Sequence, residues 1–215
     1  MIELSASVQF ISNKIDDSNK LMESVSVQFA ELRKENEELK STVAVLKNEV
    51  TVLRDRMRHQ EQYSRVNNVE INGLPSTAGE NIGDLLRDVG TAIGLQVENN
   101  DIAAAHRVPS YRRDRDPALI VQFVNRAKRD DWISKYRQIK TLTARDVNKQ
   151  FPAQRVYIND HLCPNNKLLL SKLKQRCKEI DYAFAWSRDG RFFARKSKGE
   201  AAKSITSFED VQKLV

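Results

Sequence analysis

Apolar residues recur at alternating intervals of three and four positions from Leu4 to Met57, without a break in the heptad. A single helix cannot bury such a stripe against itself. The pattern therefore predicts a coiled coil over residues 1–62 rather than one long helix lying on its own globular domain. With Val8 at position a, the seam residues expected to mediate self-association are Val25, Phe29, Leu32, Asn36, Leu39, Val43, Leu46, Val50, Leu53 and Met57.

The charges beside the seam predict how the helices run. In a parallel, in-register coil, three residues at position g meet opposite charges at position e: Glu35 with Lys40, Glu49 with Arg54 and Arg56 with Glu61. Asn36 at position a, followed by Val at a and Leu at d, favours a parallel dimer. The bulky Phe29, and a run over residues 56–61 that approaches a pattern known from three-stranded coils, keep a trimer open.

The pattern changes at Tyr63 to short strands and helices. Alternating or apolar runs predict strands at 69–72, 102–108, 118–124 and 155–158, with the third largely apolar and central. Helical spacing predicts one helix between Asn81 and Gly94, and another over 126–140 that buries Ala127, Trp132, Ile133 and Tyr136. The resulting order, βαββαβ, predicts a ferredoxin-like domain over residues 63–160, which is the fold class of the RNA-recognition motif (RRM).

This domain is not expected to stack bases on its sheet. The central strand offers only Phe123, and the first strand has no aromatic residue. Any nucleic-acid binding is therefore expected on the basic loops and helix.

Residues 161–215 form a second unit in this interpretation. A helix begins after Pro164, with Asn165 or Asn166 as its cap, and a final short helix is capped by Ser207. Between them, two alternating runs flank Arg188-Asp189-Gly190, which is a hairpin signal. The expected class is α+β: a long N-terminal parallel coiled coil, an RRM-like domain, and a small basic α/β C-terminal domain.

Charge separates the two halves of the chain. The first 62 residues carry nine Lys and Arg and eleven Asp and Glu, whereas the remainder carries 27 basic and 18 acidic side chains, a net of +9. This surplus predicts an anionic partner for the C-terminal part, with a solvated charged surface as the alternative. The sequence contains no 18-residue apolar run and no signal-peptide pattern, so we expect no membrane association and an intracellular location, cytoplasmic, nuclear or both.

The chain offers little for catalysis or metal binding. Cys163, Cys177 and His161 are too few and too widely spaced for a disulfide framework or a zinc site, so no metal and no cofactor are expected. There is no G-x-S-x-G motif and no Gly-rich phosphate loop, and Asp160-His161 is interpreted as a turn at a strand end. We therefore do not expect an enzyme.

Several segments resemble a known group of proteins. The junction QYSRVNNVEINGLP at 62–75, AHRV at 105–108, VQF at 121–123 and VYINDHL at 156–162 are similar to the baculovirus few-polyhedra (FP) proteins and their insect relatives, and to the first-open-reading-frame proteins of LINE-type retrotransposons. The hairpin with Trp186 and Gly190-Arg191 also fits the FP group. Many insect relatives carry an N-terminal zinc finger that this sequence does not contain, so a fragment or a shortened member is expected.

The resemblance implies a coiled-coil oligomer that binds single-stranded nucleic acid, RNA preferred, and remodels or packages it as a chaperone in a ribonucleoprotein. It leaves open retrotransposon particle assembly, virus maturation or a domesticated host role. A structural adaptor that recruits protein partners through the coil is the alternative function. Tyr157, Trp186 and Phe193 are stacking candidates, although an aromatic residue at such a position more often belongs to a core. The predicted nucleic-acid-binding residues are Arg65, Arg107, Arg112, Arg113, Arg115, Arg126, Lys128, Arg129, Lys135, Arg137, Lys140, Arg155, Tyr157, Trp186, Arg188, Arg191 and Arg195.

Overall fold

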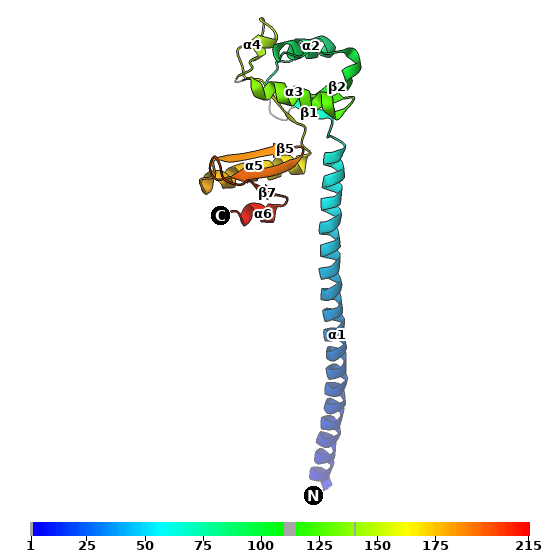
Figure 1. Ribbon diagram of the computed structural model, residues 1–215. Helices are drawn as coiled ribbons and strands as arrows, with labels where there is room; N and C mark the ends of the chain where they lie inside the picture. The colour runs from blue at the N-terminus through cyan, green and yellow to red at the C-terminus, as the bar shows by residue number, and fades with distance from the viewer. Residues whose placement is uncertain (1, 110–114, 140) are drawn as a thin grey trace. The chain divides into compact units, whose positions relative to one another are not determined.

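The structure is a computed structural model that describes residues 2–109, 115–139 and 141–215 (Figure 1). It contains one long helix at the N-terminus and two antiparallel sheets with accompanying helices. The chain divides into two compact units, residues 1–56 and residues 57–215. The mixed α and β composition and the long N-terminal helix that the sequence predicts are confirmed.

Helix α1 runs without interruption from Ile2 to Tyr63. No Gly or Pro occurs within it, so nothing in the sequence breaks the backbone hydrogen-bond ladder. Its 62 residues give a rod about 90 Å long. The heptad leucines are exposed in the single chain, with Leu32 at 62%, Leu39 at 57% and Leu46 at 51%.

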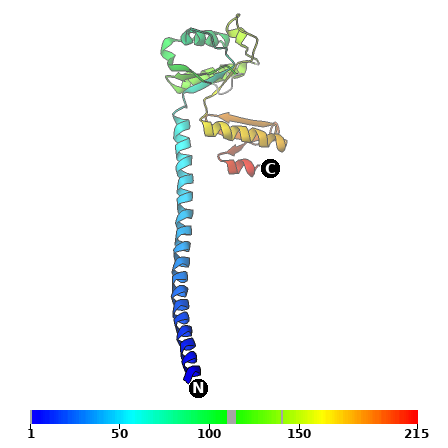
Figure 2. The same cartoon turned by 180° about the vertical axis from the view of Figure 1, so that it is seen from behind.

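The first sheet has four antiparallel strands in the order β2-β3-β1-β4. The strands are β1 (Asn68–Asn72), β2 (Ile102–Val108), β3 (Ala118–Phe123) and β4 (Tyr157–Asp160). Helices α2 (Ile82–Ala92) and α3 (Arg126–Gln138), with a 3-10 turn η1 (Asn99–Asp101) and the short α4 (Ala144–Val147), complete this part. In Figures 1 and 2, α2 lies against the sheet.

Alternation along the strands builds the core of this part. Val69 and Ile71 of β1 point to the same side as Val121 and Phe123 of β3, and both pairs are buried. Side chains from α2 and α3 close the core, including Trp132, whose ring centroid lies 5.2 Å from that of Phe123. The opposite face of the sheet is consequently the one that carries polar residues.

The second sheet orders its strands β5-β6-β7, all antiparallel. It is built from α5 (Pro164–Glu179), β5 (Phe184–Arg188), β6 (Arg191–Arg195), β7 (Lys203–Ile205) and α6 (Phe208–Gln212). Helix α5 lies alongside the β5–β6 hairpin in both views (Figures 1 and 2). Leu169, Leu173 and Cys177 of α5 pack against Phe192 and Ala194 of β6 in a separate core.

Local signals in the sequence located most elements correctly. Asn81 caps α2 by accepting hydrogen bonds from the backbone N–H groups of Gly83 and Asp84. The predicted hairpin turn is confirmed, because Asp189 and Gly190 have φ values of 54° and 71°, as a two-residue primed turn requires. The cap of α6 by Ser207 is also confirmed.

Four expectations are corrected. Strand β4 begins at Tyr157, two residues later than predicted, and α3 ends at Gln138. The N-cap position of α5 is Cys163, without a side-chain cap hydrogen bond, and not Asn165 or Asn166, because Pro164 occupies the first helical position. On α3, Ala127 is exposed and Arg129 is buried in its place. Helix α4 and strand β7 were not predicted.

Candidate nucleic-acid interface

The outward face of the β5–β6 hairpin presents alternating aromatic and arginine side chains. The inward residues Phe192 and Ala194 are buried in the core against α5. Residues one position away therefore point outward, and the strand register pairs them across the hairpin. The three outward pairs are Phe184 with Arg195, Trp186 with Phe193, and Arg188 with Arg191. We call these six residues the hairpin face.

The side chains of the hairpin face contact one another. The rings of Trp186 and Phe193 are stacked, with centroids 5.6 Å apart and an interplanar angle of 22°. The guanidinium of Arg195 lies over the Trp186 ring at 5.4 Å. At the outer edge, Phe184 is 43% exposed. The result is a preformed surface with flat apolar area and positive charge side by side.

A groove of about 700 Å³ continues from the hairpin face. Its walls come from three elements: the last turns of α1, the first turn of α3, and the hairpin. Among its lining residues are Tyr63 of α1, Arg126 of α3, and Arg188, Arg191 and Phe193 of the hairpin. Arg129 and Asp189 line it as well, so the groove combines two aromatic rings with four guanidinium groups and one carboxylate.

Gln62 holds the end of α1 against the C-terminal residues. Its amide nitrogen donates to the carbonyl of His161 at 3.1 Å, and its amide oxygen accepts from the backbone N–H of Cys163 at 3.0 Å and from the side chain of Asn166 at 2.9 Å. Gly190 packs directly on the same side chain, since a Cβ there would lie 2.6 Å from Cγ of Gln62. The α1 wall and the hairpin wall of the groove are thereby fixed to each other.

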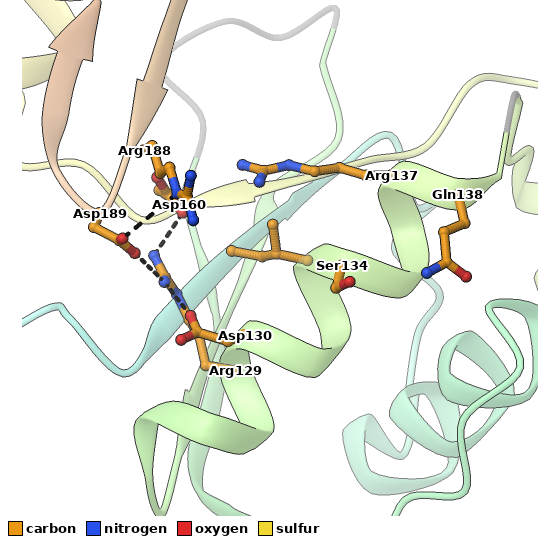
Figure 3. Close-up of a pocket in the computed structure, with 9 residues that line it drawn as sticks. Arg129, Asp130, Ser134, Arg137, Gln138, Asp160, Arg188 and Asp189 are labelled. Carbon is orange, nitrogen blue, oxygen red and sulfur yellow. Dashed lines mark hydrogen bonds and ion pairs between the residues drawn. The ribbon is translucent and has the colours of Figure 1, made fainter.

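A buried arginine ties α3 to the hairpin turn (Figure 3). Arg129 is 3% exposed and donates to Asp160 at 2.5 Å, to Asp130 at 2.6 Å and to Asp189 at 2.8 Å. Asp189 also lies 3.1 Å from a guanidinium nitrogen of Arg126. Beside this cluster, Figure 3 shows Arg137 and Arg188 at the edges of a cavity of about 420 Å³.

The cluster perturbs the pKa values of its members. Burial opposes the charge of Arg129, but the hydrogen bond to Asp189 and the charges of Asp160 and Asp130 outweigh it and raise the pKa of the guanidinium. Burial raises the pKa of Asp160, with partial compensation by Arg129. Burial would also raise the pKa of Asp189, but Arg129 and Arg126 hold it below its usual value. Asp189 is therefore an anion at neutral pH.

Two family models together match about two thirds of the chain, all of it after residue 65. The model described as baculovirus FP protein domain 1 matches residues 66–158. The model described as baculovirus FP protein domain 2 matches residues 163–215. The chain belongs to the baculovirus FP protein family. No curated protein sequence matches it.

In this FP family member, several arginines predicted to bind nucleic acid have partners inside the protein. Arg107 donates five hydrogen bonds, to Glu80 and to the carbonyls of Leu74, Pro75 and Pro117. Its side chain is 12% exposed, and its hydrogen bonds and charge lower the pKa of Glu80. All of its donors are thus engaged in the fold, so we leave Arg107 out of the proposed interface.

Three further predicted residues are also engaged. Arg129 is buried in its cluster of carboxylates, as described above. Arg65 donates to Glu61 at 2.8 Å and to the carbonyl of Leu162 at 3.3 Å. Lys128 pairs with Asp101 at 3.0 Å, a contact that raises its pKa. Arg129 therefore joins FP domain 1 to domain 2 through Asp189, Arg65 joins the end of α1 to Leu162, and Lys128 forms an ion pair at the surface.

The other predicted cations in the described part of the chain lie at the surface, some in the groove and some away from it. Arg126, Arg188 and Arg191 line the groove, while Arg137 lies beside the Arg129 cluster. Away from the groove, the guanidinium of Arg155 lies 5.3 Å from the centroid of the Tyr157 ring, and the exposed Lys135 and Arg115 stand separately. Arg112, Arg113 and Lys140 lie outside the described residues.

Sequence reasoning identified Phe193 as a stacking candidate but missed Tyr63 and Phe184. Phe184 and Phe193 share a face with Trp186 by strand alternation and register, a signal that the predicted turn already contained. Tyr63 reaches the groove only because Gln62 joins α1 to residues about a hundred positions later. No local pattern reports a contact of that kind.

The described part of this FP family member offers neither a metal cluster nor a membrane-spanning helix. Within residues 2–109, 115–139 and 141–215, no group of three or more His, Cys, Asp or Glu side chains lies close enough to hold a metal ion. Burial lowers the pKa of His161 to about 4, and its ring lies 3.3 Å from the Asn68 amide. In the described part of the chain, no helix is long and apolar enough to span a membrane.

Proposed function

We propose that this FP family member is an oligomeric protein that binds single-stranded nucleic acid, with RNA preferred, and packages or remodels it in a ribonucleoprotein. The hairpin face is the observation that carries this proposal. Bases of any sequence stack on aromatic rings, while arginine neutralises phosphates and also contributes cation–π contacts. Three aromatic and three arginine side chains on one face of a hairpin supply both contributions together.

Residues 63–160 constitute the RRM-like domain in this proposal. The order β1-α2-β2-β3-α3-β4, with antiparallel strands, matches the ferredoxin-like arrangement. RRM domains stack bases on aromatics of the two central strands. Here β3 presents Gln122 and β1 presents Glu70 on that face, and Glu70 is paired with Lys167 at 2.7 Å. Binding is accordingly assigned to the hairpin face and the groove.

Oligomerisation rests on the heptad stripe of α1. Its leucines expose more than half of their surface in the single chain, and full burial of such a side chain contributes about 1.5–3 kcal/mol. A second copy in a parallel, in-register coil buries the stripe and satisfies the three g–e charge pairs. Joining two or three copies raises the effective concentration of the second binding face, so weak sites become avid on a long strand.

Length-dependent binding tests this function. The full chain is titrated with single-stranded RNA and DNA of increasing length at two salt concentrations. A second protein carries Leu39→Lys and Leu46→Lys, which place charge in the seam and leave residues 57–215 unchanged. We expect affinity to rise with length in the unmodified protein and to rise much less in the variant, with both salt-sensitive.

The same titration distinguishes nucleic-acid binding from the alternative function. If neither polymer binds at low salt, the nucleic-acid proposal fails, and a coiled-coil adaptor for protein partners becomes the favoured function. Equal length dependence in the two proteins would remove the coil from the binding mechanism.

A further inference from the structure

Tyr63 is the last residue of α1, and its side chain is 79% exposed. It is among the most exposed large apolar side chains of residues 57–215 in the described part of the chain. A tyrosine ring in that setting has not removed its apolar surface from water. Its ring is therefore accessible to a ligand.

The backbone that carries Tyr63 is held in place. The preceding residue, Gln62, makes three hydrogen bonds to residues 161–166, and Arg58 donates to the carbonyl of Thr206 at 2.9 Å. After the helix, the N–H of Val66 donates to the carbonyl of Tyr63 at 3.1 Å, which continues the turn. A ring on a fixed backbone loses little conformational entropy when a ligand binds.

The groove around Tyr63 has the two features of a nucleotide site. Phe193 of the hairpin supplies a second aromatic surface, so apolar rings come from two sides of the groove. Arg126 and Arg191 line the same groove and supply positive charge for a phosphate, and Asp189, which also lines it 3.1 Å from Arg126, offsets part of that charge. The groove volume of about 700 Å³ is within the usual range for small-molecule sites.

We propose that Tyr63 stacks on one unpaired nucleobase of the bound strand, with the adjoining phosphates held by Arg126 and Arg191. This inference rests on the proposed function and extends it, because it makes the end of α1 part of the binding site. The strand then runs from the hairpin face into the groove and contacts the residue that directly follows the predicted coil. Paired bases inside a duplex are excluded, since neighbouring base pairs cover both of their faces.

Three substitutions in the full chain test the proposal. Tyr63→Phe keeps the ring, Tyr63→Leu keeps apolar volume without a flat face, and Tyr63→Ala removes both. A base stacked on an aromatic side chain corresponds to about a 5- to 150-fold loss of affinity when the ring is removed. We expect that loss for Leu and Ala, near-native affinity for Phe, and an unchanged salt slope in all three because no charge is altered.

A strand without bases supplies the matched control ligand. On a sugar-phosphate oligomer of the same length, the unmodified protein and Tyr63→Ala are expected to bind equally. Thermal unfolding and oligomeric mass are measured for each variant, and both are expected to match the unmodified protein because Tyr63 is exposed.

The outcomes separate this inference from the proposed function. If the unmodified protein binds neither RNA nor DNA, the proposed function itself fails. If it binds and Tyr63→Ala binds equally well, only the inference is overturned. Native affinity for Tyr63→Leu would also overturn it, as would equal weakening on the base-free strand. A change in oligomeric mass that accompanies the lost affinity would show that Tyr63 acts through the coil, and would overturn it as well.

Discussion

Replacing Arg107 with Ala is expected to destabilise residues 57–215 while leaving the salt dependence of nucleic-acid binding unchanged. The side chain bridges three segments, because it pairs with Glu80 and donates to the carbonyls of Leu74, Pro75 and Pro117. None of its N–H groups is left to bind a phosphate. Its role in this structure is to fasten the loop after β1 to the loop before β3.

The magnitude follows from what the substitution leaves behind. Glu80 is 14% exposed, so its carboxylate would remain largely buried with no cation beside it. Removing one partner of a buried ion pair costs about 3–5 kcal/mol, and the residual exposure of Glu80 places this case near the lower end, about 3 kcal/mol. For a unit of this size, the corresponding fall in melting temperature is about 6–12 °C.

Arg191→Ala is the matched comparison, because Arg191 is exposed and lines the groove. Its melting temperature is expected to stay near that of the unmodified protein, since exposed substitutions usually change stability by less than about 0.5 kcal/mol. Its binding to single-stranded RNA should weaken, and the slope of log affinity against log salt should become shallower by about 0.7. Thermal unfolding and a salt titration of both variants measure the two effects.

The reasoning would be refuted by the reverse pattern. A stable Arg107→Ala protein with a shallower salt slope would place Arg107 in the interface and deny the structural role of its hydrogen bonds. An unaltered slope in Arg191→Ala would remove Arg191 from the site.

Three other outcomes are expected. Asp189→Asn removes a negative charge beside Arg126 and keeps a residue type that tolerates positive φ. RNA affinity at low salt should therefore rise, and the slope of log affinity against log salt should steepen by about 0.7. Weaker RNA binding by a stably folded variant would contradict this. Folding lowers the pKa of His161 from 6.5 to about 4, so the folded state should lose stability as the pH drops from 6.5 to 4. The His161→Gln variant should lose less stability over the same range, which chemical denaturation at several pH values will measure. Leu39→Lys combined with Leu46→Lys should lower the oligomeric mass measured by light scattering, and an unchanged mass would exclude the predicted seam.

The elements of the fold that depend on neighbours in the sequence could be predicted. The long helix follows from a heptad with no Gly or Pro, the hairpin from Asp189-Gly190 between alternating runs, and the α2 cap from Asn81. Each of these signals acts over a few residues, where backbone preference and side-chain spacing decide the outcome.

The roles of individual arginines could not be predicted in the same way. Arg107, Arg129 and Arg191 look alike in the sequence, each standing in or beside a basic segment. What separates them is the partner that folding brings to each one: Glu80 from 27 positions away for Arg107, and Asp189 from 60 positions away for Arg129. The start of β4 differs from the predicted start for a related reason. Tyr157 pairs with Asn72 of β1, whereas Arg155 makes only an isolated bridge to Thr143.

The central claim is that the hairpin face and its groove bind unpaired nucleic acid. The most direct measurement compares the affinity of the full chain for a single-stranded RNA with its affinity for the same RNA annealed to its complement, at one low salt concentration. The account predicts that the single strand binds more tightly, because paired bases cannot stack on Trp186, Phe193 or Tyr63. Equal or tighter binding of the duplex would contradict it, and so would the absence of binding to either form.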